Sequence, residues 1–181
     1  MRLDLFNNTS FSRGRPVWIE TLWLFVQALF INSWIPGSVH RKLLLRLFGA
    51  KIGKGTFFKP GIKVKFPWRL EIGEHAWIGE DVWIDNLAKV TIGSHCCISQ
   101  GVYLCTGSHD WSKKRFNLIT KPITVMDKSW LCAKSIIGPG VTVNEGAVLG
   151  IGSLATEDLK AWWIYQGVPS TVMRERLLES K

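Results

Sequence analysis

Large aliphatic residues recur at every sixth position over most of the chain. A period of six matches neither the 3.6-residue repeat of an α-helix nor the alternation of a single strand, and it is typical of a short strand followed by a tight turn. The series shifts phase by two residues after Leu70 and after Val90, and it is interrupted after Leu104. Its positions are Ile52, Phe58, Val64, Leu70, Ile72, Ile78, Ile84, Val90, Ile92, Ile98, Leu104, Val125, Leu131, Ile137, Val143, Leu149 and Ala155.

A second position in each unit carries a mostly small residue, such as Thr56, Ala76 or Ser153, four places after the aliphatic one. Gly often follows the aliphatic residue directly, and Gly adopts turn conformations that other residues resist. We expect three units to close one triangular coil, with the aliphatic side chain inside and the small one near the corner. About fifteen units then predict an all-β solenoid of about five stacked coils. A sandwich of short strands would not keep a six-residue phase for so long.

Residues 1–48 precede the repeats and predict a helical cap over one open end of the solenoid. Pro16 precedes a helical pattern with Trp18, Leu22, Phe25 and Leu29 on one side, which ends near residues 35–37. A second helix is expected over about residues 38–48. It carries an apolar side opposite a basic one, and Gly49 ends it. The apolar residues of this second helix are Leu43, Leu44 and Leu47, and the polar ones are His40, Arg41, Lys42 and Arg46.

The apolar stretch from residue 17 to residue 35 allows three interpretations. It could cap the solenoid or contact another subunit, or it could associate with a membrane surface, because a Trp-rich face lies beside a basic helix. A membrane span is disfavoured by Glu20, Gln27, Asn32 and Ser33. No signal peptide is evident, because the first long apolar stretch begins only at Val17.

The interruption at residues 105–122 is a polar and aromatic insert, and such a loop on a rigid scaffold is a common place for function. His109 lies near its start. A histidine can take a proton from a hydroxyl group near neutral pH, so His109 is a candidate general base. The residues alone favour the other interpretation, a solvated loop histidine.

The formal net charge is +9, from 23 Lys and Arg against 14 Asp and Glu. This charge predicts an anionic partner, which could be nucleic acid, a phosphorylated cofactor or an anionic membrane. No nucleic-acid-binding motif accompanies it. The cysteines (Cys96, Cys97, Cys105 and Cys132) have neither zinc-ligand spacing nor the density of a disulfide scaffold, so a reducing compartment is expected.

The repeat units resemble those of hexapeptide-repeat acyltransferases. The units that start at Ile72, Ile78 and Ile137 read IGEHA, IGEDV and IGPGV, and the resemblance covers about residues 49–176. It implies a left-handed parallel β-helix over residues 49–160 and a C-terminal segment or helix of the coenzyme A site over residues 161–181. The stretches LLLRLFGAKIGKG, FPWRLEIG and LCTGSHDW are similar to the colanic-acid-type exopolysaccharide acetyltransferases.

The resemblance also implies a site. Residues 91–109 are similar to the segment that places the catalytic histidine in galactoside and maltose O-acetyltransferases, which makes His109 the base. Asn86 is then expected to contact the acceptor, with Asp85 as an alternative. Asp110 is expected to orient His109 or to contact the acceptor.

The donor in such a family is acetyl-CoA, bound between neighbouring subunits of a homotrimer. The positions that match its contacts are Trp130, Ala133, Ile151, Thr156 and Arg174. Two positions depart from the pattern, because Glu157 and Thr171 stand where many relatives carry a cation. Arg174, Arg176, Lys134 or Lys160 could supply the missing positive charge.

Taken together, the resemblance implies an acetyl-CoA-dependent O-acetyltransferase that acts on a sugar hydroxyl in surface polysaccharide synthesis. The acceptor could be lipid-linked and the enzyme cytoplasmic, at the inner face of the membrane. An N-acetyltransferase on an amino-sugar nucleotide and a non-catalytic scaffold remain as alternatives. No metal is expected, because the His-x4-His pair of trimeric β-helix carbonic anhydrases is absent from the sequence.

Overall fold

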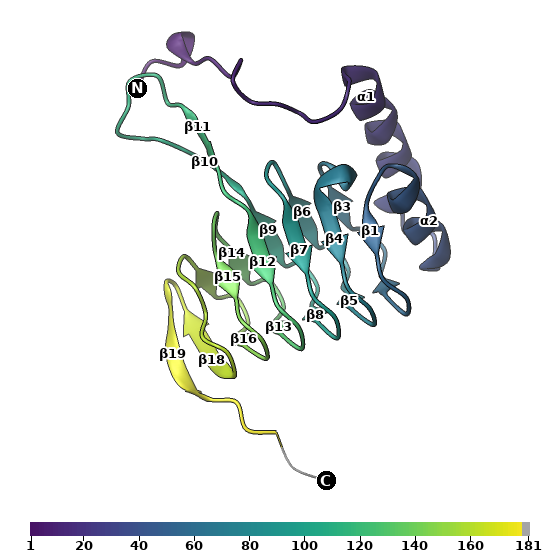
Figure 1. Cartoon of the computed structure of the whole chain (residues 1–181), viewed down its shortest axis with the longest axis vertical. Helices are drawn as coiled ribbons and strands as arrows, with labels where there is room; N and C mark the ends of the chain where they lie inside the picture. The colour runs from purple at the N-terminus through teal and green to yellow at the C-terminus, as the bar shows by residue number, and fades with distance from the viewer. Residues whose placement is uncertain (179–181) are drawn as a thin grey trace.

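The computed structural model describes residues 1–178, which form a parallel β-helix with helices at one end (Figure 1). Three sheets make the faces of a prism, and each coil contributes one short strand to each face. The first sheet contains β1 (Lys51–Ile52), β4 (Leu70–Ile72), β7 (Val90–Ile92), β12 (Ile123–Val125) and β15 (Thr142–Val143). The second contains β2 (Phe57–Phe58), β5 (Trp77–Ile78), β8 (Cys97–Ile98), β13 (Trp130–Leu131), β16 (Val148–Leu149), β18 (Trp163–Gly167) and β19 (Ser170–Glu175). The third contains β3 (Lys63–Val64), β6 (Trp83–Asp85), β9 (Tyr103–Cys105), β14 (Ile136–Ile137) and β17 (Leu154–Ala155).

The six-residue series lies inside the prism, as predicted. Ile52 pairs with Ile72, and Ile72 with Ile92, so that equivalent side chains stack from coil to coil in one continuous core. The two phase shifts have a simple cause. The strands β4 and β7 each bury both of their end residues, as Leu70 and Ile72 do in β4, which adds one inward position to the coil.

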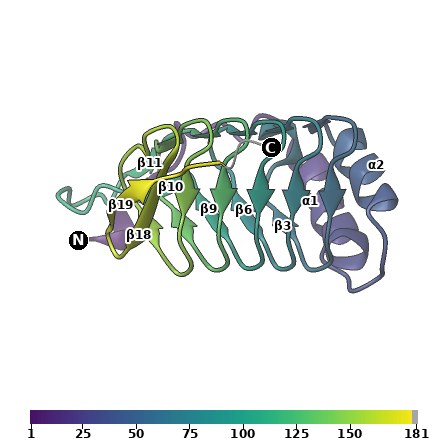
Figure 2. The same ribbon diagram turned by 90° about the horizontal axis from the view of Figure 1, so that it is seen from below.

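The solenoid has five complete coils and part of a sixth. Leu159 forms a parallel bridge with Val143, and β18 adds a further parallel strand beside β16. The C-terminal segment is not helical over the described residues. It turns back as the antiparallel hairpin of β18 and β19, with the two strands at the end of the coils opposite the helices (Figure 2). Tyr165 continues the buried series there, six residues after Leu159, and the additional phase shift between Ala155 and Leu159 was missed in the sequence.

The N-terminal helices cover the first coil, as the cap interpretation requires. Helix α1 (Val17–Val26) continues into the π-helical turn η2 (Gln27–Ile31), and α2 (Val39–Leu47) packs near β1. Trp23 joins the core of the solenoid, and its indole Nε1 donates a hydrogen bond of 2.8 Å to the carbonyl of Val64. Apolar burial and this hydrogen bond together fix α1 on the prism.

The apolar sides that the sequence predicted for the two helices face away from the prism. Trp18, Leu22, Phe25 and Leu29 all lie on the exposed side of α1 and η2, while Trp23 and Ile31 are buried. In α2 the exposed residues include Leu43 and Leu47, whereas Arg41 is fully buried.

Arg41 is buried because it serves the backbone that joins the two helices. Its guanidinium donates to the carbonyls of Ile31, Ser33 and Ile35 at 3.0, 2.6 and 2.8 Å, and also to that of Gly37. These carbonyls follow a helix end and lack intrahelical partners. Burial lowers the pKa of Arg41 from its ordinary value, yet four carbonyl acceptors hold the charged group in place.

Residues before Val17 do not belong to the cap. They run along the prism as an extended arm, with the short 3₁₀ turn η1 (Leu3–Leu5) next to the insert (Figure 1). The backbone nitrogen of Arg2 donates to the carbonyl of Lys114 in the insert, at 2.9 Å. A further 3₁₀ turn, η3 (Pro67–Arg69), lies at a corner of the first coil. None of the helices in the described part of the chain has the length and apolarity needed to cross a membrane.

Candidate functional site

The insert projects from one corner of the prism as a two-stranded arm. Strand β10 (Gly107–His109) pairs antiparallel with β11 (Leu118–Thr120), and His109 lies opposite Leu118. Thr106 fixes the base of the arm, because its buried hydroxyl donates to the carbonyl of Asp85 at 2.9 Å and accepts from the nitrogen of Ala88 at 3.0 Å. The insert is therefore built on the preceding coil and holds a defined geometry.

His109 is half-buried near the tip of β10, and its ring is held on two sides. It stacks on Phe116, with ring centroids 4.2 Å apart and an interplanar angle of 2°, and the ring of Phe6 from the N-terminal arm lies 5.6 Å away. The Nδ1 atom lies 2.8 Å from the carbonyl oxygen of Phe116. A carbonyl oxygen only accepts hydrogen bonds, so Nδ1 carries the hydrogen and Nε2 keeps a free lone pair in the neutral ring.

Phe116 holds an unusual backbone conformation, with φ of 51°. A bulky residue with positive φ is rare and costs free energy, and such conformations gather at functional sites. Here the conformation accompanies a ring that stacks on His109 and a carbonyl that accepts from it. Phe116 was not predicted, because nothing in the sequence signals which carbonyl faces a histidine.

Asp110 turns toward its own loop. Its Oδ1 atom accepts from the hydroxyl of Ser112 at 2.5 Å and from the Ser112 nitrogen at 3.1 Å. The hydrogen bonds from Ser112 hold the pKa of this carboxyl below its usual range. The hydrogen-bond partner of the His109 ring is thus the Phe116 carbonyl. A contact between Asp110 and an acceptor stays a prediction.

Asp85 lies at the end of β6, opposite Cys105 in the register. Its carboxylate accepts from the hydroxyl of Tyr103 at 3.2 Å and lies 3.2 Å from the Nζ atom of Lys65. Burial raises the pKa of Tyr103 first, and the nearby Cys105 and Asp85 raise it further, so this phenol stays a hydrogen donor. Asp85 is half-buried and sits next to the base of the arm.

Asn86 is fully buried. Its Nδ2 atom donates to the carbonyl of Phe66 at 2.7 Å, and its Oδ1 atom accepts from the Phe66 nitrogen at 2.9 Å. This pair of bonds joins two coils at a corner and occupies both ends of the amide. A contact between Asn86 and the sugar acceptor would have to replace these structural hydrogen bonds. That contact stays a prediction.

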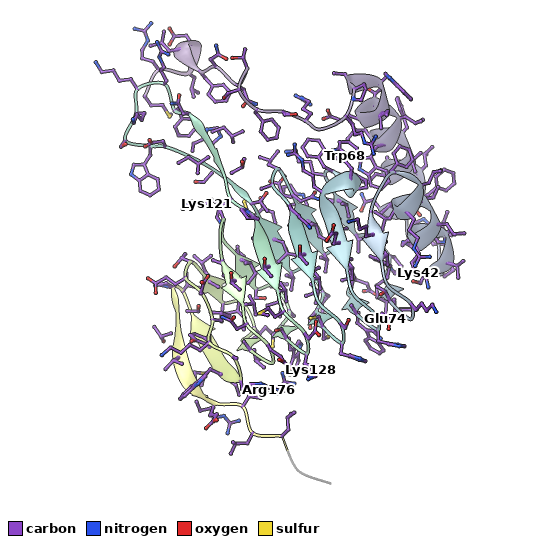
Figure 3. All side chains as sticks on the ribbon, in the orientation of Figure 1. Lys42, Trp68, Glu74, Lys121, Lys128 and Arg176 are labelled. Carbon is purple, nitrogen blue, oxygen red and sulfur yellow. The ribbon has the colours of Figure 1, made fainter. Side chains whose placement is uncertain are left out.

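The two faces of the β10–β11 hairpin of the insert border different cavities. Strand alternation sends Ser108 and Ile119 to one side, where a groove of about 460 Å³ opens. Lys121 lies at the base of the arm on this side (Figure 3). The groove is lined by Ser108, His109, Asp110, Trp111, Ile119, Lys121 and Pro139.

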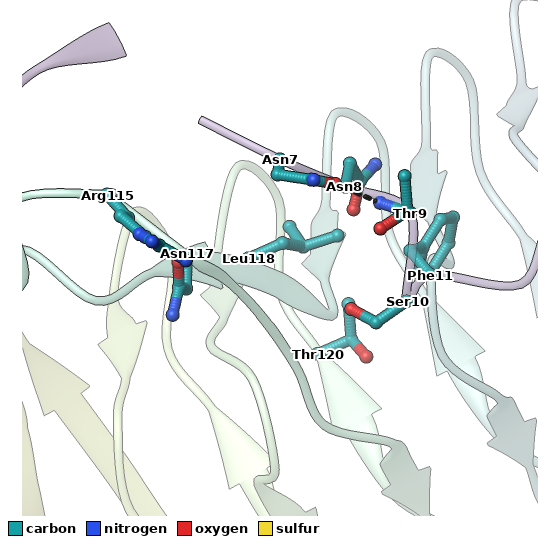
Figure 4. A pocket seen from close by; sticks show the side chains of 9 residues that line it. All are labelled: Asn7, Asn8, Thr9, Ser10, Phe11, Arg115, Asn117, Leu118 and Thr120. Carbon is teal, nitrogen blue, oxygen red and sulfur yellow. Dashed lines mark hydrogen bonds between the residues drawn. The ribbon is translucent and has the colours of Figure 1, made fainter. Parts of the chain in front are cut away.

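The other cavity, of about 450 Å³, lies between the insert and the N-terminal arm (Figure 4). Amide and hydroxyl groups line most of it, with one aromatic ring, and this combination suits a sugar. The lining residues are Asn7, Asn8, Thr9, Ser10, Phe11, Arg115, Asn117, Leu118 and Thr120. The sequence of the N-terminal arm did not predict that it contacts the insert.

The residues expected to contact acetyl-CoA lie on different parts of the later coils. Ala133 and Ile151 lie on stacked turns of one corner, where the nitrogen of Gly152 donates to the carbonyl of Ala133 at 2.9 Å. Thr156 lies on the corner that also carries the insert, further along the prism. Trp130 lies on the face of the second sheet, with its Nε1 donating to the hydroxyl of Ser99 at 2.9 Å.

A cavity of about 490 Å³ opens at the C-terminal end of the prism. It brings Thr156 together with Glu157 and Thr171, the two positions that depart from the family pattern, and with Lys160. Lys160 is thus the candidate replacement cation that shares this cavity. Arg174 is exposed on β19, and Arg176 donates to the carbonyls of Lys128 and Gly146 at 2.9 and 2.8 Å, on another corner (Figure 3).

The remaining histidines and cysteines take structural places. His75 and His95 are turn residues with φ of 54° and 58°, and their rings stack at 5.3 Å. All four cysteines are free, and burial raises the pKa of the Cys96 thiol to about 11. Among residues 1–178 no group of three potential metal ligands comes together.

The fold and the insert define the hexapeptide-repeat class of left-handed β-helix acetyltransferases. A hexapeptide-repeat acetyltransferase of Vibrio cholerae O1 biovar eltor, solved with acetyl coenzyme A, superposes with a TM-score of 0.84 at 22% identity, over 94% of each chain. The chain is 42% identical over 169 residues to "Putative colanic acid biosynthesis acetyltransferase WcaF" of Escherichia coli (strain K12), covering 92% of both proteins. It therefore belongs to this family of acetyltransferases, as its sequence motifs predicted.

A more distant relative matches a shorter part of the chain. The galactoside O-acetyltransferase of Escherichia coli (strain K12) is 28% identical over 144 residues, which is 77% of this chain and 71% of that protein. No model of a known protein family matches the chain. The roles of the individual residues of the site stay predictions.

Proposed function

We propose that the protein transfers an acetyl group from acetyl-CoA to a sugar hydroxyl, with His109 as the general base. The observation that carries the proposal is the hydrogen bond between Nδ1 of His109 and the Phe116 carbonyl, 2.8 Å long. It fixes the tautomer in which Nε2 accepts a proton. A sugar hydroxyl needs such a base, because its oxygen is a weak nucleophile while it keeps its proton.

The step is a direct transfer. Nε2 of His109 takes the hydroxyl proton as the oxygen attacks the thioester carbonyl, which gives a tetrahedral intermediate. The carbon–sulfur bond then breaks, and the imidazolium returns the proton to the sulfur, so that the acetyl ester and free coenzyme A leave. In the groove, Lys121 and the hydroxyl of Ser108 are the donors available to stabilise the oxyanion.

The sugar acceptor and acetyl-CoA must reach His109 from different directions. We assign the reacting hydroxyl to the groove that His109 lines, where it can reach Nε2, and further sugar units of a glycan to the polar cavity between the insert and the N-terminal arm, which His109 does not line. We assign acetyl-CoA to the later coils, where Ala133 and Ile151 lie on one corner and Thr156 on another, with its thioester reaching the groove beside Pro139. The relatives support a carbohydrate acceptor, since one is named for colanic acid biosynthesis and another for a galactoside.

The active assembly in this proposal is a homotrimer. Its support is a pair of aromatic columns on two faces of the prism, since a monomer would leave them in water. Phe57, Trp77 and Trp130 are exposed on the second sheet, and Trp83 stacks on Tyr103 at 4.6 Å on the third. Sedimentation velocity of the purified protein gives its mass in solution, which distinguishes a trimer from a monomer.

The proposal extends to the cellular setting. The protein acts on the cytoplasmic side of the membrane, and its acceptor is a sugar carried on a lipid. Cell fractionation gives the distribution of the protein, and mass spectrometry of the lipid-linked sugars in a deletion strain gives the acceptor. Loss of one acetyl mass from those sugars is the expected result.

A transfer assay tests the chemistry. Release of the coenzyme A thiol is followed with acetyl-CoA and a panel of soluble sugars. The variant His109→Ala is expected to lower kcat by roughly 100-fold to 10,000-fold, because proton transfer is lost. Its affinity for acetyl-CoA, measured by calorimetry, is expected to match that of the unchanged protein. The matched control is His95→Asn, at a turn position where Asn tolerates positive φ.

The outcomes separate the alternatives. An ester product is cleaved by mild base, whereas an amide product survives it and would move the amino-sugar reaction to the front. Equal turnover by His109→Ala and the unchanged protein would remove His109 as the base. Absence of acetyl-CoA binding by either protein would favour a non-catalytic scaffold or another acyl donor.

A further inference from the structure

Helix α1 presents an uncharged apolar face away from the protein. Trp18, Leu22, Phe25 and Leu29 are 48–67% exposed, where a surface helix of a soluble protein normally carries polar residues. The apolar surface continues beyond the helix to Trp34, which is 85% exposed. Other exposed apolar residues of the same segment are Val17, Leu24, Phe30 and Ile35.

The polar side chains of α1 and η2 face the prism instead. Glu20 forms an ion pair with Arg13 at 2.6 Å, and the Oε1 atom of Gln27 accepts from the backbone nitrogen of Val64 at 2.6 Å. The helical segment thus carries apolar side chains on its exposed side as well as at Trp23 and Ile31, which pack on the core. Of the four polar residues that argued against a membrane span in the sequence, Glu20, Gln27 and Ser33 are bonded within the protein, and Asn32 is exposed.

The second helix extends the apolar surface. Val39, Leu43 and Leu47 are exposed along one side of α2, at intervals of four residues. Lys42 lies at the outer edge of α2, beside this apolar side (Figure 3). Both helices lie at the free end of the solenoid, so that the surface is open to a large planar partner (Figures 1 and 2).

The positive charge of the protein is concentrated at the same end. Residues 17–70, which form the helices and the first coil, contain nine of the 23 Lys and Arg residues but only one of the 14 Asp and Glu residues, which gives this part a net charge of +8. The remaining residues, 1–16 and 71–181, carry 14 basic and 13 acidic residues, a net charge of +1. The first coil contributes the exposed side chains of Lys51, Lys54, Lys59, Lys63 and Lys65.

We propose that the helical end binds the surface of an anionic phospholipid bilayer, with α1 lying in the interface. The apolar face would enter the boundary between headgroups and acyl chains, and the lysines of the first coil would lie over the anionic headgroups. The indoles of Trp18 and Trp34 suit that boundary. Lipid chains need no shape complementarity, and the exposed face of α1 carries no charged side chain.

Vesicle sedimentation tests the proposal on the full-length protein. The protein is expected to sediment with vesicles of equal parts phosphatidylglycerol and phosphatidylcholine, and more weakly with phosphatidylcholine alone. The double variant Leu22→Glu/Phe25→Glu is expected to bind about 100-fold more weakly, since two large apolar side chains no longer leave water. The matched control Leu177→Glu/Leu178→Glu changes two exposed leucines at the opposite end and is expected to bind as the unchanged protein does.

A charge variant separates the two contributions. Lys54→Gln/Lys59→Gln is expected to lower binding to the anionic vesicles while leaving the weaker binding to phosphatidylcholine unchanged. Raising the salt concentration is expected to have the same effect, because screening acts on the electrostatic part alone.

Three results would overturn the proposal. They are no binding of the unchanged protein to either vesicle, equal binding by Leu22→Glu/Phe25→Glu, and self-association that this variant abolishes without any vesicle binding. The last result would assign the face to contacts between copies of the chain. Circular dichroism checks folding, since exposed positions should tolerate the change. Acetyl transfer to a soluble sugar is measured in parallel, so failure here is distinguishable from failure of the proposed chemistry.

Discussion

The coils and helix α1 both carry large apolar residues at regular spacing, yet they point them in opposite directions. In the coils, Ile84 and Ile98 are fully buried, and every sixth residue meets its equivalent in the next coil. In α1 and η2, the regular series of Trp18, Leu22, Phe25 and Leu29 faces away from the protein. A regular spacing of apolar residues therefore identifies one face of a helix or strand. Whether that face is buried or exposed depends on the contacts of the other residues of the same element.

Two tryptophans on α1 give the sharpest test of this comparison. Trp23 is fully buried and donates a hydrogen bond to Val64, whereas Trp18 is 67% exposed. Trp23→Ala is expected to lower the free energy of unfolding by about 3–5 kcal/mol. Trp18→Ala is expected to change it by no more than about 0.5 kcal/mol. Urea unfolding of both variants measures the difference, and equal losses would mean that the outward face is covered in the folded protein.

A second pair compares a coil with the helix directly. Ile98→Ala removes a side chain stacked between coils and is expected to cost about 2–5 kcal/mol, because the neighbouring coils cannot close the cavity. Leu29→Ala removes a side chain 61% exposed to solvent, and its expected cost is about 0.5 kcal/mol or less. The midpoints of thermal unfolding should rank in that order. A larger loss from Leu29→Ala would contradict the comparison.

Asn86 tests whether a buried polar residue of the coils is structural. Asn86→Ala leaves the nitrogen and the carbonyl of Phe66 without partners, which is expected to cost about 1–3 kcal/mol. Its matched control is Asp110→Ala, whose carboxylate bonds only within its own loop among the described residues and whose expected loss is about 0.5 kcal/mol or less. Unchanged stability of Asn86→Ala with a raised KM for the sugar would instead favour the acceptor contact.

Glycine turns give the smallest effect and a check on how tightly coils stack. Gly55 and Gly152 have similar φ, of 69° and 64°, but a Cβ atom on Gly55 would lie 2.2 Å from His75, whereas nothing lies within 4 Å of one on Gly152. Gly152→Ala is expected to cost only the backbone strain, about 1 kcal/mol. Gly55→Ala is expected to cost more, since the His75 ring must also move. Chemical unfolding compares them, and equal losses would show that the His75 ring yields freely.

The sequence predicted the solenoid well because its repeat is local. Each unit of six residues places its own aliphatic residue inside, so the period alone predicts the coils and their stacking. The partial sixth coil was missed, because Leu159 and Tyr165 keep the period only after another shift of phase. The C-terminal hairpin was missed as well, since no local signal distinguishes it from a short helix.

The candidate site was predicted in part. The position of His109 at the break in the repeat followed from the sequence and its resemblance to relatives. The carbonyl of Phe116 and the ring of Phe6 did not, because they approach His109 from a loop conformation and from an arm more than a hundred residues away in the sequence. The buried role of Arg41 was missed for the same reason, since its four acceptors are set by the path of the backbone between two helices.

By itself, the sequence determined the β-helix, the place of the insert and the family, because these depend on spacing between near neighbours. Only the tertiary structure decided the tautomer of His109, the amide bonds of Asn86 and the outward direction of the apolar face of α1. The physical reason is that each of these depends on a hydrogen-bond partner or a packing surface that the path of the backbone in three dimensions brings into place. Gln27 shows this directly, because its side-chain oxygen accepts from the nitrogen of Val64 in the first coil, while Trp18, Leu22 and Leu29 face out.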